Sequence, residues 1–193
     1  LERPDHKQYL LDVYGVKDTD TLTTKRAVEL GHIFQLGDKY SKSMNGTFVN
    51  KDNGVSNYVM GCYGIGVSRT LAMLYEANAI VNNGKVEGVA LPLNVAPYKL
   101  YIVPKTDDSA KLALANKLHD TLIENGVDVL IDDRLDLSIG AKIKDSKITG
   151  TPFVVVCGKS VDNGLLELEN NKTGEKTEIK IDEFVDYCIK NLK

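Results

Sequence analysis

Residues 98–193 alternate short β-branched runs with segments of helical periodicity, and this alternation restricts the fold more than any other feature of the chain. The valine-rich run PFVVVCG at 152–158 predicts a strand buried in a sheet. Residues 107–125 carry apolar side chains four positions apart, which predicts a helix ended by Gly126. Strands and helices that alternate through short connections form parallel sheets. We therefore expect an α/β fold with a βαβαβ-type domain.

The other elements of this half follow from the same rules. β-rich runs predict strands, helical spacing predicts helices, and a Lys-Thr-Gly turn predicts a hairpin. We expect strands at 98–104 and 127–132, helices at 138–149 and 182–192, and a hairpin at 165–181 that turns at 172–174.

The first half has the pattern of an antiparallel sheet, so the whole chain is expected to be α+β. Residues 32–50 and 55–66 predict two strands joined by the turn at 51–54, and a helix is expected at 67–78. The segment at 88–99 has two prolines and no helical period, which favours a domain boundary. We expect domains at 1–90 and 91–193; residues 1–24 show no clear pattern.

Charge and cysteine content exclude several classes of protein. The formal net charge is −3, with 10 residues of each sign in 1–97 and 14 basic against 17 acidic in 98–193, so neither half is a basic nucleic-acid module by composition. Three widely spaced cysteines argue against a disulfide framework and a CxxC zinc site, which favours a reducing cytoplasm. No apolar run reaches the roughly 18 residues of a membrane span. The first residues resemble neither a natural start nor a signal peptide, so we expect a piece of a longer protein.

The stretch GCYGIGVSR at 61–69 is the strongest candidate for a ligand site. Its glycines permit close backbone approach, and Arg69 adds positive charge where a strand gives way to a helix, which suggests a phosphate-bearing ligand. The spacing matches neither the dinucleotide fingerprint nor the P-loop. An ordinary strand-to-helix turn with a solvated arginine is the alternative.

GCYGIGVSR resembles motif 3 of class II aminoacyl-tRNA synthetases, and RAVELGHIFQLGDKYS at 26–41 resembles bacterial-type prolyl-tRNA synthetases. The second half is similar to the anticodon-binding domain of that family. The resemblance implies part of a catalytic antiparallel sheet followed by this domain, and an enzyme that activates proline with ATP and transfers it to tRNA(Pro).

The resemblance also implies roles for individual residues. Strand alternation puts His32 and Phe34 on one face, and in this family that face lines the amino-acid pocket. The implied proline-binding residues are His32, Phe34 and Cys62. The implied ATP-binding residues are Glu29, Gly61, Gly64, Gly66 and Arg69, with Arg69 as the catalytic contact to the γ-phosphate. A hydrogen-bonded core histidine and a buried structural cysteine are the alternative interpretations.

The sequence departs from the family pattern in a few places. Ser68 stands where many class II enzymes have glutamate, which suits the prolyl subfamily. No segment resembles motif 1 or motif 2, so we expect the chain alone to be inactive; an editing domain is likewise expected to be absent from it. The family implies Mg²⁺ beside ATP and a homodimer for the full-length enzyme, with no metal bound by this chain.

Residues after the strand at 127–132 are candidates for anticodon contacts. Proline anticodons share two guanines, whose Watson–Crick donors a carboxylate can accept. We expect Asp132 or Asp133 to read a guanine while basic side chains hold phosphates. The predicted set is Asp132, Asp133, Arg134, Lys142 and Lys144, with Lys147 nearby. A surface ion pair and a solvated helix face are the alternative.

Two other functions remain open at this point. One is a non-catalytic tRNA-binding or accessory module, which would not need a proline pocket or the motif 3 arginine. The other is a class II synthetase of another specificity.

Overall fold

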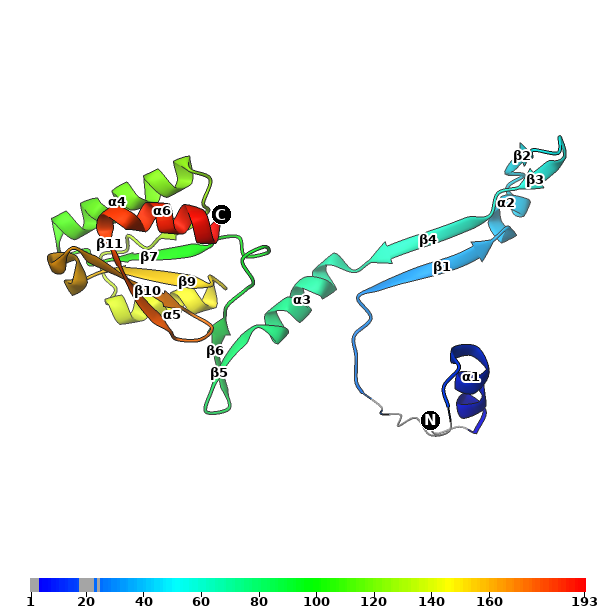
Figure 1. The fold of residues 1–193 in the computed structure, drawn as a ribbon, viewed down its shortest axis with the longest axis horizontal. Coiled ribbons are helices and arrows are strands. Elements are labelled where there is room, and N and C mark those ends of the chain that lie inside the picture. Colours follow the sequence, from blue (N-terminus) through cyan, green and yellow to red (C-terminus); the bar gives the residue numbers. More distant parts are fainter. Residues whose placement is uncertain (1–3, 18–22, 24) are drawn as a thin grey trace. The chain divides into compact units, whose positions relative to one another are not determined.

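The computed structural model describes residues 4–17, 23 and 25–193 (Figure 1). The chain divides into two compact units, residues 1–67 and 68–193. The first unit contains α1 (Pro4–Tyr14), β1 (Gly31–Gly37), α2 (Lys39–Ser43), β2 (Thr47–Val49), β3 (Val55–Asn57) and β4 (Met60–Ile65).

Helix α3 (Val67–Ala77) begins at the division, and the second unit continues with one hairpin and a layered domain. Its elements are β5 (Ala79–Asn82), β6 (Lys85–Val89), β7 (Leu100–Pro104), α4 (Ser109–Glu124), β8 (Val129–Ile131), α5 (Ile139–Ile148), β9 (Phe153–Cys157), the 3-10 helix η1 (Lys159–Asn163), β10 (Leu165–Asn170), β11 (Lys176–Lys180) and α6 (Ile181–Leu192).

The second unit is built on a five-stranded sheet with the order β11-β10-β9-β7-β8. Strand β7 pairs in parallel with β8 and β9, while β10 is antiparallel to β9 and β11. All five residues of β7 are buried, because central strands of such a sheet are covered on both faces. The predicted α/β domain, its strands and its hairpin at 165–181 are confirmed.

Helices α4 and α6 cover one face of this sheet and α5 covers the other (Figure 1). The larger core lies under α4 and α6, and includes Leu100, Ile102 and Phe184 at 0% exposure. The smaller core under α5 is formed by Tyr101, Val103 and Val154. Side chains of Asp108 and Ser138 accept hydrogen bonds from backbone N–H groups at the starts of α4 and α5. These caps position the helix starts at the carboxyl ends of β7 and β8.

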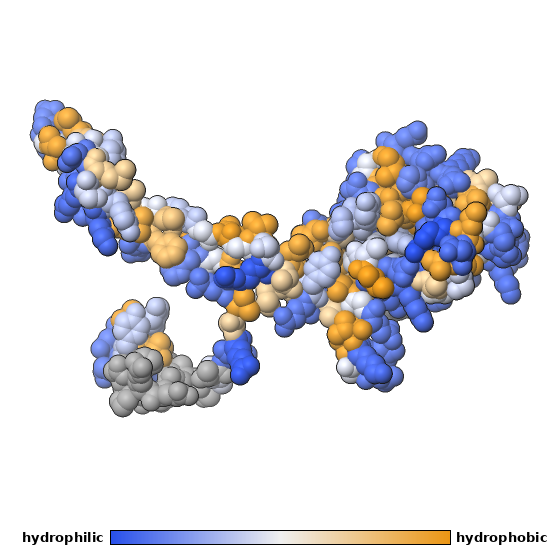
Figure 2. All heavy atoms as spheres, turned by 180° about the vertical axis from the view of Figure 1, so that it is seen from behind, coloured by the Kyte–Doolittle hydropathy of each residue, from blue (hydrophilic) through white to orange (hydrophobic). Residues whose placement is uncertain are grey.

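The first unit contains an antiparallel ribbon of β1 and β4, as the sequence predicts. The prediction of one strand over 32–50 is wrong, because β1 ends at Gly37, whose φ of 57° favours glycine, and helix α2 follows. Strands β2 and β3 then form the hairpin around the predicted turn at 51–54. Apolar side chains remain at the surface of this ribbon (Figure 2), including Ile33, Tyr63 and Ile65 at 68%, 76% and 78% exposure.

Several elements lie outside the sequence expectations. Residues 1–24 show no clear pattern in sequence, yet helix α1 forms within them; strands β5 and β6 form a hairpin in a region with no predicted strand. Across 4–17, 23 and 25–193, no helix is both long and apolar enough to cross a membrane.

Candidate functional site

Strand pairing brings the three predicted proline-binding residues onto one face of the β1–β4 ribbon. His32 lies opposite Gly64, and Phe34 lies opposite Cys62. Residues directly opposite in an antiparallel pair point to the same face. The rings of His32 and Phe34 stack with centroids 4.0 Å apart and planes 25° from parallel. The result is a flat aromatic surface beside the exposed thiol of Cys62.

Predicted ATP-site residues flank this surface. Glu29 Oε1 lies 3.5 Å from His32 Nδ1, so the carboxylate sits beside the aromatic pair. A side chain at Gly64 would meet no atom within 4 Å, which leaves the face open across from His32. The Gly66 N–H donates to the Leu30 carbonyl at 2.8 Å and continues the pairing beyond β1.

Gly61 differs from Gly64 in the face that it occupies. It lies opposite Gln35, on the face of Ile33 and Tyr63, and a Cβ there would stand 3.0 Å from the Tyr63 hydroxyl. The glycines of the motif therefore serve both faces of the ribbon. Among these glycines, only Gly64 and Gly66 are an even number of positions from Cys62, so they fall on the same side of the strand as Cys62.

Arg69 lies in the first turn of α3, within the second unit, whereas Glu29, His32 and Cys62 lie in the first. A guanidinium near a helix N-terminus adds to the positive end of the helix dipole, which favours an anionic ligand. The predicted ATP residues are thus divided between the two units.

The predicted anticodon residues form a connected polar network at the end of β8. Arg134 donates to Asp132 from Nε to Oδ1 at 2.8 Å and from Nη2 to Oδ2 at 2.6 Å, and its Nη2 also donates to Asp145 Oδ2 at 2.6 Å. The Tyr101 hydroxyl donates to Asp132 Oδ2 at 2.9 Å. This fork-to-fork pair fixes the chain where it leaves the sheet.

The network perturbs two ionisable groups. The hydrogen bonds from Arg134 are the main cause that lowers the pKa of Asp132 to about 2. Burial, together with the Asp132 carboxylate, raises the pKa of Tyr101 to about 12. Asp132 is therefore ionised at neutral pH, and its oxygens are already occupied within the protein.

Lys142 requires a correction. The sequence places it among exposed phosphate-binding lysines, but its side chain is fully buried and Nζ donates to the Asp132 carbonyl at 2.9 Å. An ammonium at 0% exposure cannot reach an RNA backbone. Asp132, at 4% exposure, likewise lies inside, whereas Asp133 and Lys144 are exposed.

Tyr101 and Asp145 belong to this network but were missed from the sequence. Tyr101 is an ordinary strand residue in sequence, and Asp145 lies 11 positions after Arg134. No short motif links these residues, because the sheet and α5 bring them together. The sequence feature that could have pointed to this network is Tyr101, a hydroxyl-bearing residue on the face of the central strand that α5 covers.

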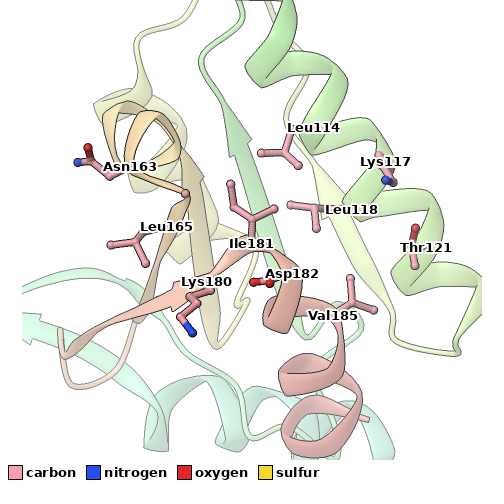
Figure 3. A pocket seen from close by; sticks show the side chains of 11 residues that line it. Leu114, Lys117, Leu118, Thr121, Asn163, Leu165, Lys180, Ile181, Asp182 and Val185 are labelled. Atoms are coloured by element: carbon pink, nitrogen blue, oxygen red, sulfur yellow. The ribbon is translucent and has the colours of Figure 1, made fainter.

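Several cavities lie in the second unit outside the polar network. One of about 810 Å³ opens between α4, α6 and the start of β10 and contains none of the predicted site residues (Figure 3). Figure 3 shows Leu114, Leu118 and Ile181 pointing into it. A cavity of about 340 Å³ lies at the end of β7, between residues 104–107 and 135–139. A third, of about 540 Å³, lies between α5 and β6.

Comparison with known protein families assigns both halves of the chain. Residues 11–78 match the tRNA synthetase class II core domain (G, H, P, S and T), and residues 99–191 match an anticodon-binding domain. A proline–tRNA ligase of Fusobacterium nucleatum is 41% identical over 165 residues, which cover 85% of this chain and 28% of the relative. One from Bacillus licheniformis is 34% identical and covers 100% of this chain and 34% of the relative. This chain is similar to part of the prolyl-tRNA synthetases.

Solved structures of prolyl-tRNA synthetases have a similar fold. The enzyme of Cryptosporidium parvum, complexed with L-proline and AMP, has a TM-score of 0.75 at 22% identity, covering 86% of this chain and 34% of that one. The Giardia lamblia enzyme, in complex with prolyl-adenylate, has a TM-score of 0.69 at 25% identity over 81% of this chain and 33% of that one. The chain thus spans about a third of the length of its prolyl-tRNA synthetase relatives.

The predicted ATP residues of this chain include one carboxylate, Glu29. Among the described residues, no group of three or more histidine, cysteine, aspartate or glutamate side chains could hold a metal ion. One carboxylate together with substrate phosphates is, however, a common way to bind Mg²⁺. The residues present are therefore compatible with a magnesium ion brought by ATP.

Proposed function

We propose that this chain is part of a proline–tRNA ligase, which activates proline with ATP and transfers it to tRNA(Pro). The observation that carries the proposal is the match to proline–tRNA ligases, with identities of 34–42% over most of the chain. The aromatic pair and the open glycine of the β1–β4 ribbon support the same function, because they form a small, flat, partly apolar surface beside a glycine-rich strand.

In this proposal the proline-binding residues are His32, Phe34 and Cys62. The stacked rings offer apolar contact to a pyrrolidine ring, and the small Cys62 side chain leaves room for it. Glu29, Gly61, Gly64 and Gly66 bind the nucleotide, and Arg69 holds its γ-phosphate. Activation joins the proline carboxylate to the α-phosphate of ATP and releases pyrophosphate, so these residues contribute position and charge rather than covalent chemistry.

The second half would bind the anticodon of tRNA(Pro). Asp133, Arg134 and Lys144 are the exposed members of the predicted set, but the Arg134 side chain is held by Asp132 and Asp145. The 340 Å³ cavity beside residues 135–139 lies at the carboxyl edge of the sheet, where α/β folds bind ligands. Asp132, Arg134 and Lys142 would position this edge instead of touching RNA. Mg²⁺ on the ATP phosphates, a homodimeric full-length enzyme and a cytoplasmic location complete the proposal.

Proline-dependent ATP–pyrophosphate exchange tests this function. The chain alone should give background exchange, because it has no segment that resembles the motif 2 arginine of class II enzymes. In the full-length protein, Arg69→Ala should slow exchange by about 10²-fold or more, with a smaller loss for Arg69→Lys, which keeps the charge but not the fork.

Lys85→Ala, an exposed cation at the β5–β6 turn, is the control and should leave exchange unchanged. If pyrophosphate exchange depended on another amino acid, that amino acid would be the substrate in place of proline. An unchanged exchange rate in the Arg69→Ala variant would show that Arg69 is not part of the ATP site.

A further inference from the structure

The end of α3 is joined to the five-stranded domain through Asn78, the residue that follows the helix. Asn78 is 8% exposed, and each of its polar groups forms a hydrogen bond. Its backbone N–H and its side-chain Nδ2 both donate to the Leu74 carbonyl, at 3.1 and 2.9 Å. Its backbone carbonyl accepts from the Ala90 N–H at 3.1 Å, and its Oδ1 accepts from Lys172 Nζ at 3.0 Å. The function proposed above assigns no role to these contacts.

Lys172 reaches Asn78 from the turn between β10 and β11, where its own backbone is fixed. Asn170 Oδ1 accepts from the Lys172 N–H at 2.9 Å. The residue between these two, Asn171, is 2% exposed, and its Nδ2 donates to the Thr151 carbonyl at 2.8 Å. Because the backbone of the turn is already held, only the rotamers of the Lys172 side chain are restricted when it contacts Asn78.

A second contact brings the chain after β6 against the same domain. The Leu91 N–H donates to the Gly150 carbonyl at 3.0 Å. Gly150, between α5 and β9, has a φ of 77°, and a Cβ there would stand 3.0 Å from Leu91 Cδ1 and 3.8 Å from the Tyr75 hydroxyl. The chain after β6 and the last turn of α3 therefore both lie close to the corner between α5 and β9. The hydrogen bond from Lys172 to Asn78 adds a side-chain contact to this joint.

The direction of α3 decides where Arg69 lies. None of the 11 residues of α3 is buried, so packing among the described residues does not fix its direction. Arg69 comes nine positions before Asn78, which at a helical rise of about 1.5 Å per residue separates them by about 14 Å. A change of about 4° in direction at Asn78 would therefore move the start of the helix by about 1 Å. A misplacement of about 1 Å in a reacting complex can slow the reaction by about 10²-fold.

We propose that Lys172 positions Arg69 for ATP by holding the far end of α3 on the five-stranded domain. Lys172 is a positioning residue, because it acts through the helix and touches no substrate. A hydrogen bond from an ammonium to an amide oxygen is charge-assisted and stronger than one between neutral groups. Asn78 passes this restraint to α3 through its two hydrogen bonds to Leu74. The inference rests on the function proposed above, because it needs Arg69 to hold the γ-phosphate.

Proline-dependent pyrophosphate exchange by the full-length enzyme, measured while ATP is varied, tests this role. Lys172→Met keeps the length of the side chain and removes the donor. It should lower kcat/KM for ATP by about 5- to 20-fold, less than Arg69→Ala, because the guanidinium is displaced but still present. The KM for proline should change by less than about twofold, because the residues proposed to bind proline lie on the β1–β4 ribbon. Lys172→Arg keeps a cationic donor and should recover most of the loss.

A double-mutant cycle with Arg69→Ala separates positioning from a general effect on the fold. If Lys172 acts through Arg69, Lys172→Met should change kcat/KM for ATP by less than about twofold in the Arg69→Ala background, because no guanidinium is left to misplace. A loss of folded enzyme would instead lower kcat equally in both backgrounds and leave both KM values unchanged. Lys176→Met is the matched control from the same hairpin: its ammonium pairs with Glu167 at 2.8 Å, and the variant should leave exchange unchanged.

The outcomes separate this role from the broader function. If the full-length enzyme shows no proline-dependent exchange, or if Arg69→Ala exchanges at the unsubstituted rate, the function proposed above fails in that respect and the positioning role fails with it. If Arg69→Ala slows exchange but Lys172→Met leaves kcat/KM for ATP unchanged, the positioning role alone is overturned. It is also overturned if Lys172→Met costs as much in the Arg69→Ala background as in the unsubstituted enzyme.

Discussion

The β1–β4 ribbon and the five-stranded domain are both held together by strand pairing, but only the second has a hydrophobic core. Among the described residues, every buried hydrophobic side chain lies at position 90 or later. The ribbon leaves Ile33 and Ile65 exposed, and the proposed proline-binding pair His32 and Phe34 is close to half exposed. Backbone pairing thus positions the ligand-facing residues of the ribbon, whereas packing fixes those of the domain.

Thiol reactivity should show the largest difference between the two regions. Cys62 on the ribbon is exposed, while burial raises the pKa values of Cys157 and Cys188 to about 12. At pH 8 the buried thiols should react with iodoacetamide at least about 10³-fold more slowly than in denaturant, because thiolate falls tenfold for each pKa unit. Mass spectrometry of timed samples measures each site. Fast labelling of Cys157 in the native chain would contradict a closed core.

A matched pair of isoleucine substitutions compares the packing of the two regions. Ile102→Ala removes a side chain at 0% exposure from β7, and Ile33→Ala removes one at 68% exposure from β1. The first should lower the free energy of unfolding by about 3–4 kcal/mol through lost burial and a cavity. The second should change it by less than about 0.5 kcal/mol. Denaturant titration followed by circular dichroism gives both values, and equal losses would mean that the ribbon is buried in solution.

Adjacent aspartates provide a smaller and pH-dependent comparison within the domain. Asp132→Ala should cost about 2 kcal/mol, because the buried Tyr101 hydroxyl and the Arg134 fork lose their acceptor. Asp133→Ala, at an exposed position, should cost less than about 0.5 kcal/mol.

The pKa of Asp132 sets the pH range of this effect. Its value of about 2 lies below the unfolded value of about 3.9, so its contribution is present above about pH 4 and is lost as the pH falls toward 2. The difference in stability between the unsubstituted chain and Asp132→Ala should shrink over that interval. A difference that stays constant from pH 5 to pH 2 would show that Asp132 does not act through its charge.

Much of the domain could be predicted because its signals are local. The valine run of β9, the helical spacing of α4 and the Lys-Thr-Gly turn before β11 each report on one element, and alternation of strands and helices implies the layers. The break of the predicted 32–50 strand was not foreseen, because a short helix after Gly37 depends on a backbone conformation that propensity indicates only weakly. Helix α1 was missed because residues 1–24 show no clear pattern in sequence.

The sequence by itself determined the similarity to prolyl-tRNA synthetases, the α/β domain and the shared face of His32 and Phe34, because motifs and strand alternation are properties of neighbouring residues. Only the tertiary structure decided which charges are available to a ligand. Asp132 and Lys142 are used internally because the sheet and α5 enclose them, while Glu87 and Lys147 line one cavity because Gly88 lets β6 pack on α5. Burial and pairing of a charge depend on elements far apart in the chain, and no local pattern encodes that proximity.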